Sequence, residues 1–116
     1  MSGGITGTDM DNHIELKAGV KFKHLNTHFA SFINAVCRAW WICTPAIITV
    51  ITSGNDSKHM ADSLHYQDKA WDLRTNNLEK GKVEEIAHML RTDLGPDWDV
   101  VIEKTHLHVE YDRKGI

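Results

Sequence analysis

The chain has 116 residues, of which 41% are hydrophobic and 25% charged, and its formal net charge is -3. This length corresponds to one domain, and the composition is that of an ordinary soluble globular protein. The absence of a basic patch or polybasic run argues against nucleic acid or an anionic membrane as partner. The most apolar run, residues 39–51, contains Pro45 and is shorter than the ~20 residues that a membrane-spanning helix needs.

The first twelve residues are rich in Gly, Ser and Asp and offer little to bury. We therefore expect a flexible tail over residues 1–12, followed by a single domain over residues 13–116. The N-terminus has neither the basic nor the apolar region of a signal peptide, so we expect synthesis in the cytoplasm. The two cysteines, Cys37 and Cys43, do not make a disulfide framework and are expected to be free thiols.

Apolar periodicity predicts the elements of the first half of the domain. Residues 14–22 alternate briefly, which permits a short strand or turn. Asn26 or Thr27 can cap a helix, whose apolar residues recur at spacings of three and four: Phe29, Phe32, Ile33, Val36, Cys37, Trp40 and Trp41. Pro45 ends this helix, because the residue before a proline is pushed out of the helical region. Residues 46–52 are rich in β-branched side chains and predict a buried strand.

The second half predicts a strand, a helix and a hairpin. A polar loop over residues 57–68 leads into a short strand at 69–73. Asn76 or Asn77 opens a helix that ends at Gly95, with one apolar face: Val83, Ile86, Ala87, Leu90 and Leu94. Two alternating runs within residues 98–111 form an antiparallel hairpin. The sum is an α+β domain in which two main helices pack on a small antiparallel sheet.

Histidine and aspartate side chains recur in a pattern that suits a metal. His65 and Asp72 are seven residues apart, and His106 and His108 lie in an alternating run near the C-terminus. Two histidines and one aspartate are a plausible ligand set for a catalytic zinc, which leaves the fourth position for water. Residues two apart on a strand share a face, so one of His106 and His108 can bind while the other reaches water or substrate. Spacing alone fits an exposed loop histidine and a solvent-facing strand pair equally well.

Residues 63–72, S-L-H-Y-Q-D-K-A-W-D, resemble the S-x-H-x-x-G-x-A-x-D signature of the peptidase M15 family. His106-Leu107-His108-Val109-Glu110 resembles the closing H-x-H element of that family, and the resemblance covers about residues 49–111 in the correct order. The family includes D-alanyl-D-alanine carboxypeptidases, L-alanyl-D-glutamate endopeptidases and phage endolysins. It belongs to a wider group with the hedgehog signalling domain. The resemblance implies a hedgehog/DD-peptidase-like fold and a Zn²⁺ cofactor.

Carried over residue by residue, the resemblance implies three zinc ligands, namely His65, Asp72 and His108. His106 is then the group that handles the proton or steadies the tetrahedral intermediate. Other branches of the family place an acidic residue three positions before the last ligand, where this chain has Thr105. Glu103 is the reserve candidate, although strand alternation predicts that it faces away from His106.

The resemblance also suggests residues around the metal. Ser63 is expected to hydrogen-bond near it and to fix the ligand loop. The arginine that often follows the Ser-Gly turn of the family is missing, so Lys58 or Arg74 is expected to supply a positive charge for a substrate carboxylate. Asp68 stands where the family has a glycine.

The function implied by the resemblance is that of a zinc metallopeptidase, a hydrolase that degrades the bacterial cell wall. It would cut an amide bond in peptidoglycan stem peptides as a bacteriophage or prophage lysis enzyme, an endolysin, acting on the wall after release from the cytoplasm. The alternative is a non-catalytic, zinc-containing cell-wall binding module of the same fold, which Asp68 and the missing arginine favour. A third possibility is a cytosolic dipeptidase.

Overall fold

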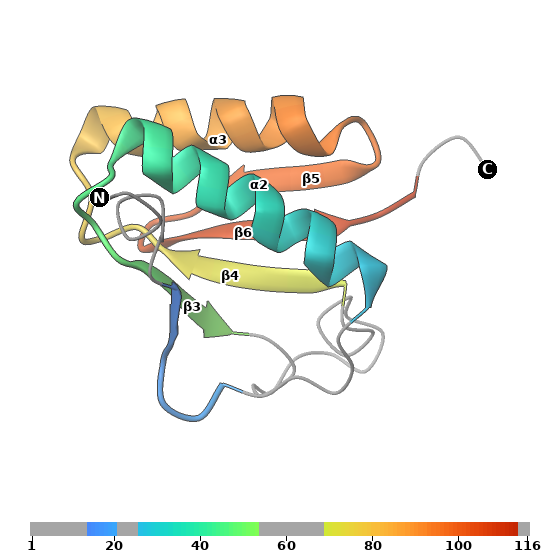
Figure 1. Ribbon diagram of the computed structural model, residues 1–116, viewed down its shortest axis with the longest axis horizontal. Helices are drawn as coiled ribbons and strands as arrows, with labels where there is room; N and C mark the ends of the chain where they lie inside the picture. Colours follow the sequence, from blue (N-terminus) through green and yellow to red (C-terminus); the bar gives the residue numbers. More distant parts are fainter. Residues whose placement is uncertain (1–13, 21–25, 54–68, 114–116) are drawn as a thin grey trace, which may run out of the picture.

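Two helices lie across one face of a sheet in the computed structural model, which describes residues 14–20, 26–53 and 69–113 (Figure 1). The sheet order within those residues is β2-β3-β4-β6-β5. The elements in chain order are β2 (Ile14–Leu16), α2 (Thr27–Cys43), β3 (Thr49–Ser53), β4 (Ala70–Arg74), α3 (Lys80–Leu94), β5 (Trp98–Ile102) and β6 (His106–Tyr111). The predicted α+β class, with two main helices on a small sheet, is confirmed.

Helix α2 begins and ends where the sequence predicts. The Asn26 side chain accepts a hydrogen bond from the backbone N–H of Phe29 at 3.0 Å, which satisfies one of the free N–H groups of the first turn. The helix ends at Cys43, and its C-cap Thr44 directly precedes Pro45. None of the helices in the described part of the chain is long and apolar enough to cross a membrane.

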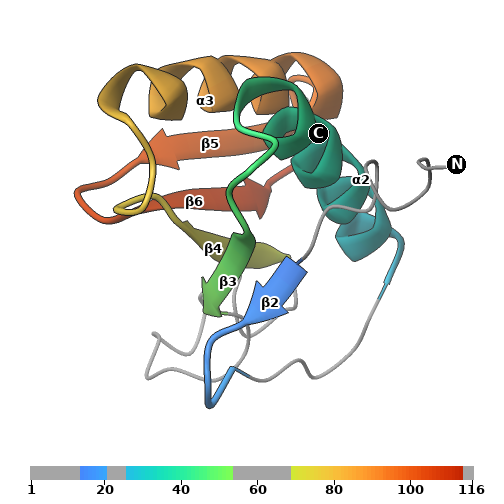
Figure 2. The same ribbon diagram turned by 60° about the vertical axis from the view of Figure 1, so that its left-hand side comes forward.

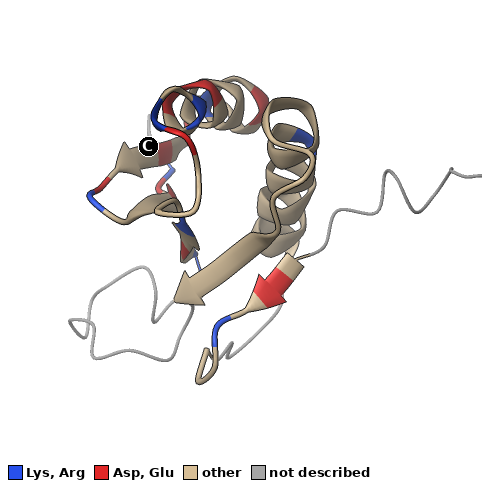
Figure 3. Cartoon of the chain, turned by 90° about the vertical axis from the view of Figure 1, so that its left-hand side faces the viewer, with Lys and Arg blue, Asp and Glu red and all other residues tan. Residues whose placement is uncertain are grey.

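Helix α3 starts later than predicted. Its N-cap is Glu79, not Asn76 or Asn77. The reason is a turn before the helix, in which the backbone N–H of Leu78 donates to the carbonyl of Thr75 at 3.0 Å. The end of α3 is as predicted, at Gly95, whose φ of 94° favours glycine. Figure 3 shows charged residues gathered along α3, whereas α2 carries few.

The sheet is mixed, whereas the sequence predicted a small antiparallel sheet. The β3–β4, β4–β6 and β6–β5 pairs are antiparallel, but β2 pairs in parallel with β3. Figure 2 shows these two strands side by side at one edge. Helix α2 connects them, and a crossover of this kind returns the chain in the same direction.

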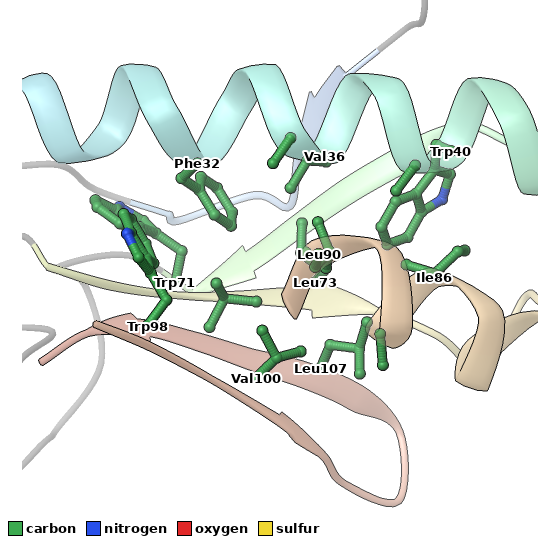
Figure 4. Close-up of a cluster of buried hydrophobic side chains, with 14 of the residues drawn as sticks. Phe32, Val36, Trp40, Trp71, Leu73, Ile86, Leu90, Trp98, Val100 and Leu107 are labelled. Atoms are coloured by element: carbon green, nitrogen blue, oxygen red, sulfur yellow. The ribbon is translucent and has the colours of Figure 1, made fainter. Parts of the chain in front are cut away.

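The core lies between the helices and the sheet. Strand alternation turns Trp71 and Leu73 of β4 and Leu107 and Val109 of β6 towards the helices, and each is at most 1% exposed. Figure 4 shows the side chains of α2, α3 and these strands meeting in one cluster. The alternate residues of β4 and β6 therefore point to the face that the helices leave uncovered.

Candidate metal centre

The uncovered face of the sheet carries a group of polar side chains at its centre. Strands β4 and β6 are neighbours and pair in antiparallel register, with Asp72 opposite His108 and Arg74 opposite His106. These four residues are each partly exposed, while the residues between them are buried. The period-two alternation that buries the core thus gathers titratable groups from two distant segments on the other face.

Asp72 and His108 are in direct contact. The Nδ1–H of His108 donates to Oδ1 of Asp72 at 2.8 Å, and their side chains are only 21% and 13% exposed. Nε2–H of the same ring donates to Oε1 of Glu110 at 2.6 Å. The ring lies between two carboxylates, so both ring nitrogens carry protons when no metal is present.

These hydrogen bonds stabilise the charged form of His108. The bond to Asp72 is the largest cause and the bond to Glu110 adds to it, against an opposing effect of burial. Together they raise the pKa of His108 from 6.5 to about 9. A metal ion at this position would have to replace one of the two ring protons.

The donor set of this pair fits zinc. Asp72 offers a carboxylate oxygen and His108 an imidazole nitrogen, and these two atoms are 2.8 Å apart. Two ligands of a tetrahedral zinc with bonds of about 2.0–2.1 Å lie roughly 3.3 Å apart, so a small movement of either side chain would suffice. The residues present therefore suit a metal of the kind that the sequence predicts.

His106 lies beside this pair and contacts Glu103. Its Nε2 is 2.7 Å from Oε1 of Glu103 and 3.9 Å from Oδ1 of Asp72. The expectation that Glu103 faces away from His106 is wrong, because β5 ends at Ile102 and the chain turns back before β6. In this turn the backbone N–H of Glu103 donates to the carbonyl of His106 at 2.9 Å, which brings the two side chains together.

A cleft of about 320 Å³ opens next to Asp72 and His106. Its wall includes two cations, Lys17 and Arg74. Neither forms an ion pair with another residue of the described ranges. The remaining lining residues carry hydroxyl or amide groups: Thr52, Ser53, Asn76 and Thr105. The cleft therefore combines acid, imidazole and positive charge in one place.

The predicted site residues divide into two groups. Asp72, His106, His108, Glu103 and Arg74 come together on this face and its rim, as described above. The other three predicted residues lie outside the described residues: His65, Ser63 and Lys58.

Two residues of the site were missed by sequence reasoning. Glu110 is two residues after His108, so strand periodicity could have placed both on one face. Lys17 carries no comparable signal, because its position depends on the pairing of β2 with β3.

Comparison with known proteins identifies relatives of this domain. The family model of the hedgehog amino-terminal signalling domain matches residues 16–110. The Tiggy-winkle hedgehog protein and the Sonic hedgehog protein, both of Danio rerio, are each 32% identical to the chain over 66 residues. That alignment covers 55% of this chain and 16% of each relative, so the chain matches about a sixth of the length of these proteins.

These matches correct two predictions from the sequence. A bacteriophage endolysin that degrades the cell wall is contradicted, because the family found is a signalling domain with relatives in a vertebrate. Peptidoglycan stem peptides as the partner are contradicted by the same finding. These matches do not show the peptidase M15 family. They support only the coarser expectation of a hedgehog/DD-peptidase-like fold.

Proposed function

This chain belongs to the family of hedgehog amino-terminal signalling domains, and we propose that it is a zinc-dependent hydrolase acting on peptide amide bonds. The observation that carries this proposal is the Glu103–His106 pair, at 2.7 Å, beside Asp72 and His108. A metal that only stabilises a fold needs no second acid–base pair at its side, whereas hydrolysis does.

In the proposed centre, Asp72 and His108 would hold zinc, with His65 as the third ligand by resemblance to the peptidase M15 signature. When bound, the metal would acidify a water molecule and polarise the carbonyl of the substrate. Proton transfer and binding of the substrate are assigned to side chains of this chain.

Hydrolysis requires a proton to leave the water and a proton to reach the departing amine. In this reaction the water oxygen bonds to the carbonyl carbon and the C–N bond breaks. Nε2 of His106 is 2.7 Å from Oε1 of Glu103, and both groups can exchange protons, so the pair can accept the proton of water and then deliver one to the amine. Glu103 also stabilises the positive charge on His106 while the proton is held.

The charges that line the cleft suit a substrate with an anionic group. Lys17 and Arg74 line it together with Asp72 and His106, and no acidic partner among the described residues neutralises either cation. A carboxylate of a short peptide would be attracted to these cations, and would then lie next to the proposed metal. Arg74 is opposite His106 in the β4–β6 pairing, so the two side chains leave the sheet on the same face.

A direct test is incubation of zinc-loaded protein with a mixed library of short peptides, followed by mass spectrometry. Chelator-sensitive cleavage that is lost in His106→Ala supports the proposal. Stoichiometric zinc with no cleavage of any library member would contradict it.

A second candidate is a zinc-containing recognition domain without hydrolytic activity. The description of the matched family as a signalling domain favours it, because a fold alone does not establish catalysis. The same library distinguishes the two candidates, since a recognition domain would retain particular peptides intact, and chelation would release them.

A further inference from the structure

Glu110 contacts one of the proposed metal ligands from the side away from Asp72. Its Oε1 accepts a hydrogen bond from Nε2 of His108 at 2.6 Å, while Nδ1 of the same ring faces Asp72 at 2.8 Å. The two carboxylates therefore lie at opposite nitrogens of one imidazole. Glu110 is only 23% exposed, so this contact is partly shielded from water.

The position of Glu110 follows from the strand that carries it. Glu110 is two residues after His108 on β6, so both side chains emerge on the uncovered face of the sheet. Ala70 of β4 is directly opposite Glu110 and is fully buried. A small neighbour on that side leaves room for the carboxylate to bend back towards His108.

A carboxylate in this place controls which nitrogen of His108 is available to a metal. A metal-binding imidazole uses one nitrogen as ligand and donates a hydrogen bond from the other, usually to a carboxylate or carbonyl group. Glu110 accepts from Nε2, which leaves Nδ1 directed at the position beside Asp72. It also makes the imidazole a stronger electron donor and fixes the plane of the ring.

We infer that Glu110 is the positioning residue that orients His108 for zinc. This inference rests on the proposed zinc centre, but not on hydrolysis. Residues in this role commonly contribute a factor of roughly 10–100 to metal affinity.

Glu110 also belongs to a group of carboxylates with Asp99 and Asp112, whose oxygens lie within 4.8 Å of one another. Acidic groups of this kind are common on protein surfaces and do not indicate an ion by themselves. Asp112 is exposed, and its side chain provides a matched control, because removal of its charge alters the same face of the sheet.

The test measures zinc affinity by competition with a chromophoric chelator, using the full chain and three variants. Glu110→Ala should weaken binding by roughly 10–100-fold, and Glu110→Gln, which keeps an acceptor for Nε2–H, should recover part of that loss. Asp112→Asn should bind zinc like the wild type. Nitrogen-15 NMR of the zinc-loaded protein should show the proton of His108 on Nε2 in the wild type and a mixed or altered state in Glu110→Ala.

Two outcomes overturn the inference. One is an unchanged zinc affinity in a folded Glu110→Ala protein, or in Glu110→Gln if the alanine variant does not fold. The other is an equal loss in Asp112→Asn, which would assign the effect to the charge of the face. Neither outcome depends on peptide cleavage. A wild type that binds zinc without hydrolysis would contradict the proposed function, but the zinc affinities would still test the role of Glu110.

Discussion

Asp72 and His108 lie opposite each other in the β4–β6 pairing, and Oδ1 of the first is 2.8 Å from Nδ1 of the second. Thirty-six positions separate them in the sequence. Their contact therefore depends on the register of two central strands. A shift of one residue in that register would turn either side chain into the core and abolish the site.

The register is maintained by the buried residues between the site residues, so the core is expected to be sensitive to truncation. Leu107→Ala removes a fully buried side chain next to His106 and His108 and should cost about 2–5 kcal/mol in the free energy of unfolding. Val101→Ala, at a side chain that is 43% exposed, should change it by less than about 0.5 kcal/mol. Urea unfolding of both variants checks this difference, and equal effects would contradict the described core.

The Glu103–His106 pair is expected to affect turnover without affecting the metal. His106→Ala should lower kcat for a cleaved peptide by roughly 10²–10⁴-fold, because the proton-handling group is lost. Glu103→Gln should give a smaller loss, since the imidazole stays but its anionic partner does not. Zinc content measured on the same samples should match the wild type; a fully active His106→Ala protein would show that the pair is not used.

The cations of the cleft are expected to select anionic substrates. Arg74→Gln should raise KM for a peptide with a free carboxylate by about tenfold, which corresponds to about 1.4 kcal/mol. The amidated form of the same peptide should show little change. Lys104→Gln removes an exposed cation that does not line this cleft and is the matched control. An equal rise for both peptides would argue against charge recognition.

The stability of the metal-free protein should depend on pH through His108. Its pKa in the folded protein is raised to about 9, above the ordinary value of 6.5. A group with a raised pKa contributes its full stabilisation below about pH 6.5, and this contribution is lost as the pH rises through about 9. Urea unfolding between pH 6 and 9.5 with a chelator should show the decline. His108→Gln should remove the part of this decline in stability that comes from His108. An identical pH profile in the variant would contradict the assignment of the decline to His108.

Much of the fold could be predicted, because its elements follow local rules. The apolar stripe of α2, the Asn26 cap and the alternation of β5 and β6 depend on residues that are close in sequence. The parallel pairing of β2 with β3 could not be predicted, since it depends on how α2 packs over the sheet. The start of α3 was misplaced because a turn at Thr75 competes with the first helical residues.

The residues of the site could mostly be predicted from the sequence, whereas the contacts between them could not. Alternation gave Asp72 and the two histidines of β6 a common face only once the register of β4 against β6 was known. The same rule was applied to Glu103 beyond the end of its strand, where it does not hold. Glu110 was overlooked because the H-x-H element gives a role only to its two histidines, although the spacing of Glu110 from His108 indicated a shared face.

The central claim is that this chain holds zinc through Asp72 and His108, and the most direct measurement is the zinc content of dialysed protein. The wild type should retain one zinc per chain, whereas Asp72→Ala and His108→Ala should lose it while remaining folded by circular dichroism. Lys104→Gln, at an exposed residue of the turn between β5 and β6, should retain it. A wild type without zinc after loading, or an Asp72→Ala protein that keeps its zinc, would contradict the account.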